Sequence, residues 1–192
     1  MNQNDITRQE KFILITGTTG TGKTTFCLDL INEKLKTNQN RVLLINPNDE
    51  KLANYPNINL DSKEISKFKG IRKAYILDKK DWKNLKNFQN GMLVLDDCRR
   101  YIPDNLPIEL RDIFINNRHY HIDIITVGHG FTEVPPKFYT FAKQLVLFKT
   151  LDSVKLRKKE LGSNFEKVEK LIESVAKQYI TNKHHKQIIS LI

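Results

Sequence analysis

GTTGTGKTT, residues 17–25, places three of the chain's eight glycines and five threonines within nine residues. The spacing from Gly17 to Lys23 and Thr24 is G-x-x-x-x-G-K-[ST], the pattern of a phosphate-binding P-loop. A short apolar run at 12–15 precedes the loop, as expected of a buried parallel strand, and apolar residues at helical spacing follow it from 26 to 35. This context disfavours a chance Gly/Thr turn. The stretch therefore predicts a domain that binds a nucleoside triphosphate.

Each residue type in the loop suits a phosphate. Glycines permit positive φ angles, so that successive N–H groups face phosphate oxygens, and the following helix adds the positive end of its dipole. We expect Lys23 to face solvent above the loop and to reach the β- and γ-phosphates of ATP, and Thr24 to hold Mg²⁺ through its hydroxyl. The predicted nucleotide-binding residues are Gly17, Thr18, Thr19, Gly20, Thr21, Gly22, Lys23, Thr24 and Thr25.

Strand-like and helix-like segments alternate beyond the loop, which is the pattern of an α/β protein. Helices are expected through Trp82, Leu85 and Phe88, from about Asp104 to Arg118, and after a capping box at 163–166. The stretch 48–72 is irregular and polar, as in a functional loop. We expect a P-loop ATPase domain over 1–150 and a basic helical extension over 151–192 that packs on it. Further strands are expected at 41–47, 73–78, 91–97, 121–130 and 142–149.

Composition allows this fold and excludes some other classes. Of the 192 residues, 39% are hydrophobic and 28% charged, which is typical of a globular chain. No apolar run approaches the ~20 residues of a membrane span, and the polar N-terminus does not resemble a secretory signal. Cys27 and Cys98 are expected to be buried free thiols in a reducing compartment.

The net charge of +10 is concentrated near the C-terminus. From Lys143 onward there are eleven Lys or Arg residues against five Asp or Glu, including the runs LRKKE at 156–160 and NKHHK at 182–186. These runs indicate either a solvated helix face or a surface that contacts a polyanion.

The segment LVLDD, residues 93–97, resembles a Walker B strand. Asp96 at its end is expected to hold Mg²⁺ through water, facing the P-loop. Asp97 is placed to orient and deprotonate an attacking water. A kinase for a small acceptor does not need a carboxylate at this position. The alternative is that Asp97 only caps the following helix.

Two residues after this strand extend the predicted site. Arg118, seven residues after Arg111, is expected on a helix stripe about 100° from the apolar one, where it could reach the γ-phosphate of a neighbouring subunit. An exposed arginine at a helix end is the alternative. His129 lies at the carboxyl end of the 121–130 strand, where a γ-phosphate sensor is expected if that strand lies beside the P-loop strand. His119 and His121, with no Cys/His cluster nearby, give little support for zinc.

These motifs, together with NNRHYHIDIITVGHG and VPPKFYTFAKQLVLFKT, resemble the FtsK/HerA-type ATPases over roughly 11–150. The similarity is greatest to their viral genome-packaging branch and to the related Zot-like assembly ATPases of filamentous phages. In this family the sensor is usually Gln, and His129 stands in its place.

The resemblance implies a RecA-like, mainly parallel sheet with the Walker A strand central and helices on both faces. It implies ATP and Mg²⁺ as cofactors, and catalysis by Asp97, Arg118, Lys23 and His129. The expected partners are double-stranded DNA, portal or capsid proteins, and other copies in a closed ring of about five or six subunits. The expected place is the host cytoplasm, at a capsid vertex, without a membrane span.

Two other functions remain open on the sequence. One is a nucleotide or nucleoside kinase, in which Asp97 is only structural. The other is a phage assembly or secretion ATPase that does not move DNA.

Overall fold

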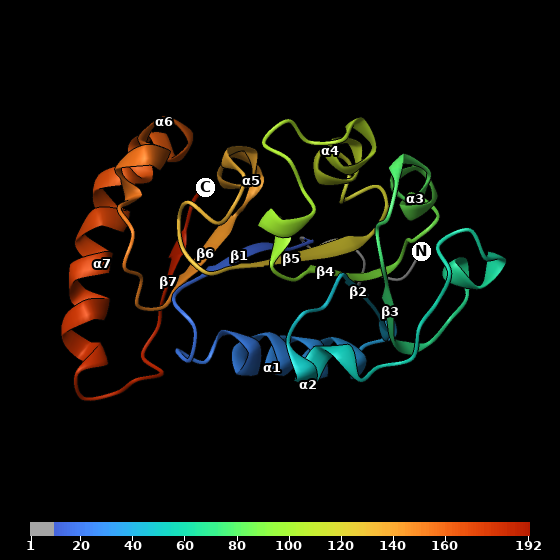
Figure 1. The fold of residues 1–192 in the computed structure, drawn as a ribbon, viewed down its shortest axis with the longest axis horizontal. Helices are drawn as coiled ribbons and strands as arrows, with labels where there is room; N and C mark the ends of the chain where they lie inside the picture. The colour runs from blue at the N-terminus through green and yellow to red at the C-terminus, as the bar shows by residue number, and fades with distance from the viewer. Residues whose placement is uncertain (1–9) are drawn as a thin grey trace, which may run out of the picture.

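A computed structural model describes residues 10–192 and arranges seven strands in one sheet of order β3-β2-β4-β5-β1-β6-β7 (Figure 1). All neighbouring strands are parallel except β7, which runs antiparallel to β6. Residues 1–9, which carry most of the polar N-terminus, lie outside the described residues. The strands are β1 (Phe12–Thr16), β2 (Arg41–Ile45), β3 (Gly70–Ala74), β4 (Gly91–Leu95), β5 (Ile122–Gly128), β6 (Gln144–Leu147) and β7 (Gln187–Ser190).

Helices cover both faces of the sheet, so the fold has three layers (Figure 1). Helices α1 (Lys23–Leu35) and α2 (Glu50–Ala53) lie on one face, and α3 (Lys79–Leu85), α4 (Ile108–Ile115) and α5 (Pro136–Phe141) lie on the other. Apolar side chains form one core on each side, and β1 and β4 are buried along their whole length. This explains why both strands appear in the sequence as unbroken apolar runs. The predicted α/β class is confirmed.

Strand order determines which loops meet. Strand β5 lies between β1 and β4, with Thr16 opposite Gly128 and Leu95 opposite Thr126. The chain segments that leave these three strands therefore emerge side by side at the carboxyl edge of the sheet, where α/β folds bind ligands. Strand β1 is interior, as expected of the Walker A strand, and the middle of the seven positions is taken by β5.

The ends of β3 and α3 differ from the sequence-based prediction. The strand expected at 73–78 ends at Ala74, because the Ile76 N–H donates to Asn46 Oδ1 (2.8 Å) and Asp78 caps α3. That helix ends at Leu85, although Phe88 remains buried.

The helix expected from about Asp104 to Arg118 is α4, and it is shorter. It starts at Ile108, because Pro107 disfavours a helical conformation at the residue before it. It ends at Ile115, so Arg118 lies in the turn that follows.

The stretch 48–72 is less irregular than its composition suggests. It contains α2 and a 3₁₀ turn, η2 (Lys63–Ser66), and it buries Leu52, Leu60 and Ile65 against the sheet. Another 3₁₀ turn, η3 (Cys98–Arg100), follows β4. Cys27 and Cys98 are buried and free, as predicted.

The C-terminal segment joins the same sheet. It contains η4 (Val154–Arg157), α6 (Lys158–Leu161), η5 (Gly162–Asn164) and α7 (Phe165–Tyr179), and then β7, which the sequence analysis did not predict. The prediction of a capping box at 163–166 is wrong. Residues 163 and 164 belong to η5, and Asn164 Nδ2 donates to the Leu191 carbonyl (3.0 Å) instead of capping α7. The apolar side of α7 packs on the core, as predicted. None of the helices within residues 10–192 combines the length and apolar character needed to cross a bilayer.

Candidate functional site

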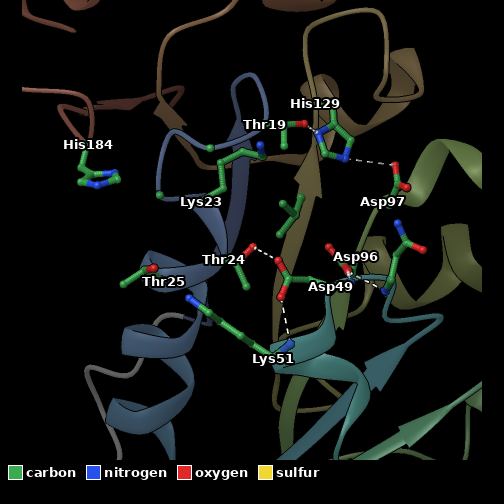
Figure 2. A pocket seen from close by; sticks show the side chains of 14 residues that line it. Thr19, Lys23, Thr24, Thr25, Asp49, Lys51, Asp96, Asp97, His129 and His184 are labelled. Atoms are coloured by element: carbon green, nitrogen blue, oxygen red, sulfur yellow. Dashed lines mark hydrogen bonds and ion pairs between the residues drawn. The ribbon is translucent and has the colours of Figure 1, made fainter.

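A cavity of about 530 Å³ opens at the carboxyl edge of the sheet (Figure 2). The P-loop forms one wall, and the segments that follow β2, β4 and β5 form the others. The loop between α7 and β7 also reaches it, through His184. The side chains labelled in Figure 2 are Thr19, Lys23, Thr24, Thr25, Asp49, Lys51, Asp96, Asp97, His129 and His184.

The P-loop is held in shape by its own hydrogen bonds and by β6. The Thr18 N–H donates to the Lys149 carbonyl (2.7 Å), and the Thr21 hydroxyl donates to the Thr18 carbonyl (2.8 Å). Gly22 has a φ of 99°, which favours glycine, and it precedes α1 without capping it through a side chain. The first N–H groups of α1 therefore point toward the cavity without a side-chain acceptor at the cap, an arrangement suited to phosphate oxygens.

Lys23 does not face solvent, so that expectation is wrong. Its residue is 6% exposed, and its Nζ donates to the Thr18 carbonyl (2.8 Å) inside the loop. Burial lowers the pKa of Lys23, and the charges of Asp96, Asp97 and Asp49 partly oppose this shift. The ammonium group of Lys23 is thus enclosed and, among the described residues, donates a hydrogen bond to a carbonyl instead of forming an ion pair. It is well placed to bind an anionic ligand.

Oxygen atoms gather beside Lys23, around the Thr24 hydroxyl. Thr24 Oγ1 donates to Asp49 Oδ2 (2.9 Å), and Asp96 is 7% exposed. Asp96 Oδ2 accepts N–H groups from Asn48 (2.9 Å) and Asp49 (3.4 Å). Burial raises the pKa of Asp96, with the nearby Asp97 and Asp49 adding to the effect, so that a cation beside it would stabilise its ionised form.

These residues fit Mg²⁺. Hydroxyl and carboxylate oxygens are its preferred ligands, and in nucleotide sites one or two carboxylates with substrate phosphates suffice. No group of three His, Cys, Asp or Glu residues within 10–192 is arranged to hold a metal by itself. Thr24 and Asp96, the two metal-binding residues predicted, both line the cavity, and Asp49 lies between them (Figure 2).

Asp97 and His129 lie next to each other in the lining of the cavity (Figure 2). His129 Nε2 lies 3.8 Å from Asp97 Oδ1, and His129 Nδ1 lies 3.3 Å from the Thr19 hydroxyl at the tip of the P-loop. The side chains of residues that follow three different strands thus form a chain from the P-loop to the second carboxylate. His129 thus contacts both the P-loop and Asp97.

The alternative interpretation of Asp97, a helix cap, finds no support. Asp97 precedes η3, but its side chain makes no capping hydrogen bond. Its backbone is left-handed, with a φ of 46°, an unusual conformation for a residue other than glycine. Arg100 Nη1, on an exposed side chain in η3, lies 3.7 Å from Asp97 Oδ2. The other oxygen, Oδ1, faces His129 in the lining of the cavity.

The loop that carries His129 is fixed by the chain after β6. Asp152 Oδ2 accepts the Thr132 N–H (2.7 Å) and hydroxyl (3.0 Å). Arg157 Nε donates to the Phe131 carbonyl (2.9 Å). Arg157, one of the basic residues at 156–160, therefore serves the fold, whereas Lys155, Lys158 and Lys159 are exposed.

The predicted arginine lies far from this cavity. Arg118 is exposed in the turn before β5, at the amino edge of the sheet, and its charge lowers the pKa of Lys143 in addition to the larger effect of burial. Arg111 is also exposed, on α4. Nearby, Asp123 pairs with Lys34 (2.6 Å) rather than with a histidine.

Sequence reasoning missed Asn48, Asp49 and His184. Asp49 follows β2, so its place at the carboxyl edge could have been found by applying the strand-end rule to every strand. His184 lies in a run that was interpreted only by its charge. Its approach to the P-loop depends on β7, which has no strong signal in the sequence.

Comparison with known families agrees with this geometry. A family model described as zonular occludens toxin (Zot) matches residues 11–191. The chain belongs to the Zot family. The match extends through the C-terminal segment, beyond the part for which the motifs showed a resemblance, so β7 lies within the Zot match. No curated protein matches the chain.

Solved structures similar to this Zot-family chain share its fold. The genome packaging NTPase B204 from Sulfolobus turreted icosahedral virus 2, in complex with AMP, matches with a TM-score of 0.72 and 15% identity, covering 96% of this chain and 94% of B204. A structure described as B204, the DNA-packaging ATPase from Sulfolobus turreted icosahedral virus, matches with a TM-score of 0.68 and 16% identity, over 94% and 92% of the chains. At these identities the likeness confirms the P-loop NTPase fold.

Proposed function

We propose that this chain is a Mg²⁺-dependent ATPase that drives double-stranded DNA into a viral capsid. We place it in the host cytoplasm, in a homo-oligomeric ring at the capsid vertex, with portal or capsid proteins as partners. Three facts support the proposal: the arrangement of the P-loop cavity, membership of the Zot family, and the shared fold with B204, which is described as a genome packaging NTPase. The observation that carries it is the carboxylate of Asp97, which faces His129 without capping a helix.

Residue roles follow from the geometry. The N–H groups at the start of α1, with Lys23, hold the phosphates. Thr24 and Asp96 would hold Mg²⁺, which would help to neutralise the charge of the bound phosphates. Asp97 orients the attacking water and accepts its proton, and His129 reports the γ-phosphate by way of Thr19 (3.3 Å). The P-loop ATPase domain over 1–150, with the basic segment 151–192 packed on it, is part of the proposal, and β7 of that segment belongs to the same sheet.

Hydrolysis is separated from kinase activity by the fate of the γ-phosphoryl group. We expect wild-type protein with Mg²⁺ and ATP to release inorganic phosphate without any added acceptor, with one oxygen derived from the water. Phosphate release measured in ¹⁸O-labelled water, with and without nucleosides and nucleoside monophosphates, tests this. Phosphorylation of an acceptor in place of phosphate release would contradict the ATPase assignment.

The basic segment at 155–159 offers a defined test of DNA binding. Replacing Lys155, Lys158 and Lys159 with Gln should weaken double-stranded DNA binding and reduce the slope of log affinity against log salt by up to about three, because each phosphate contact releases a counterion. Fluorescence anisotropy at several salt concentrations measures the slope. The matched comparison is the triple variant Lys167→Gln, Lys170→Gln and Lys177→Gln on α7, which removes the same charge elsewhere. Equal slopes in both variants would place the DNA path on another surface.

Arg118 is proposed to act on the nucleotide of a neighbouring subunit. It lies at the amino edge of the sheet and the P-loop lies at the carboxyl edge, so it cannot serve its own site. Arg118→Ala should bind ATP normally and lose about 1000-fold or more in turnover, as expected for an arginine finger. Arg111→Ala, an exposed arginine on α4, is the control.

Mixing two variant proteins tests whether Arg118 acts on the nucleotide of a neighbouring subunit. Combined with Asp97→Asn, which keeps its arginine, Arg118→Ala should regain activity in proportion to the interfaces that pair an intact Asp97 with an intact Arg118. Wild-type turnover by Arg118→Ala alone would exclude the role.

A further inference from the structure

The loop between α7 and β7 returns to the P-loop from the far end of the sequence. A Cβ atom built on Gly22 would lie 3.0 Å from His184 Nδ1, so the imidazole packs directly against the loop beside the start of α1. Lys186 Nζ lies 4.7 Å from the centre of the Phe26 ring, on the first turns of α1. Two residues of the C-terminal segment thus stand next to the phosphate-binding elements.

Strand β7 fixes this position. Gln187 is opposite Leu147 in the antiparallel register, which brings the preceding residues alongside Phe148 at the carboxyl end of β6. Gln187 Nε2 also donates to Ser174 Oγ on α7 (2.9 Å). The loop is therefore anchored from the sheet and from the helix, and its approach to the P-loop is a property of the fold.

The loop and α1 border a second cavity, of about 220 Å³. It shares the lining residues Gly22, Thr25 and His184 with the phosphate cavity, so the two cavities adjoin each other. In the view of Figure 2, His184 lies on the opposite side of Lys23 from His129 and Asp97. The second cavity therefore extends away from the reacting end of a bound triphosphate.

Its lining suits a flat aromatic ligand with polar edges. The exposed His184 ring offers an aromatic face on which a base can stack, and Phe26, with Lys186 above its ring, forms the neighbouring wall. Asp29 supplies a hydrogen-bond acceptor and Lys186 a donor. A tail segment that only closed the fold would bury apolar side chains here, whereas His184 and Asp29 remain exposed.

We propose that this cleft is the nucleoside subsite, and that the α7–β7 loop supplies it through His184 and Lys186. The inference rests on the proposed nucleotide-binding function and extends it, because the P-loop alone recognises only phosphates. The base stacks against His184, with Lys186 at its edge above the Phe26 ring, and the ribose lies over Thr25. The C-terminal segment is thereby part of the ATP site.

Comparing ATP with inorganic tripolyphosphate separates the two halves of the site. Isothermal titration of the full chain with each ligand, at the same Mg²⁺ concentration, should show ATP binding about tenfold or more tighter in the wild type. His184→Ala should remove most of that preference while leaving tripolyphosphate affinity within about twofold, which also shows that the variant is folded. His184→Phe should retain the preference, since the stacking face is kept.

A charge control completes the experiment. Lys186→Ala should reduce the preference for ATP, whereas Lys183→Ala, which removes the same charge from an exposed residue of the same loop, should not. Equal wild-type affinity for the two ligands, or an unchanged preference in His184→Ala, would overturn the subsite. Failure of the wild type to bind either ligand would instead refute the underlying nucleotide-binding function, and the subsite with it.

Discussion

Asp97→Asn should bind ATP and Mg²⁺ nearly as the wild type does and hydrolyse ATP about 100- to 10,000-fold more slowly. The carboxylate lies 3.8 Å from His129 and makes no capping bond, so the amide removes a proton acceptor while keeping the size and shape of the side chain. The loss should fall on kcat and kcat/KM alike, because the interaction is made in the transition state. Steady-state phosphate release and equilibrium ATP titration measure the two quantities separately.

Two comparisons sharpen this result. Asp96→Asn should weaken Mg²⁺-dependent ATP binding itself, because Asp96 belongs to the oxygen set beside Thr24. Asp104→Asn removes an exposed carboxylate that pairs with Arg99 outside the cavity, and it should leave turnover unchanged. If Asp97→Asn keeps wild-type turnover, the hydrolase assignment loses its chemical basis and Asp97 is a structural residue.

Lys23→Ala should reduce turnover to below about 1% of wild type, the scale expected when a preorganised donor to a reacting phosphate is removed. The folded protein should not be destabilised. Burial lowers the pKa of Lys23, so its ammonium form costs folding free energy at pH 7, and removing it takes that cost away. The variant should therefore unfold at a temperature no lower than that of the wild type in the absence of nucleotide.

Ligand-dependent stability distinguishes this from misfolding. At ATP concentrations about 100-fold above Kd, binding should stabilise the wild type by about 2.7 kcal/mol, and this gain should be absent in Lys23→Ala. Lys36→Ala, an exposed lysine at the end of the same helix, is the matched control and should keep both turnover and stabilisation. Normal hydrolysis by Lys23→Ala would refute the P-loop assignment.

The parts of the site that could be predicted from sequence depend on local spacing or on strand ends. The P-loop is a contiguous motif between a strand and a helix, and Asp97 and His129 each follow a buried strand, so both were expected at the carboxyl edge. Their approach to 3.8 Å follows from β5 lying between β1 and β4. That strand order is a long-range property, and the prediction for His129 therefore depended on the condition that its strand lies beside the P-loop strand.

The parts that were missed depend on contacts between distant segments. Asp49 meets Thr24 across 25 positions, and His184 meets Gly22 only because β7 pairs with β6. Lys23 was expected in solvent because a motif specifies which residues line a loop but not how the loop folds around them. The start of α4 was a local error, since Pro107 itself excludes an earlier start.

ATP hydrolysis measured with and without double-stranded DNA is the most direct test of the proposed packaging function. A DNA motor hydrolyses ATP faster when it is bound to DNA. Wild-type phosphate release should therefore rise severalfold on adding linear double-stranded DNA. The increase should be absent in Asp97→Asn. The stimulation should also decline as salt weakens the phosphate contacts. ATP hydrolysis that is abolished in Asp97→Asn but indifferent to DNA at every salt concentration would show an ATPase that does not act on DNA, and would contradict the proposed packaging function.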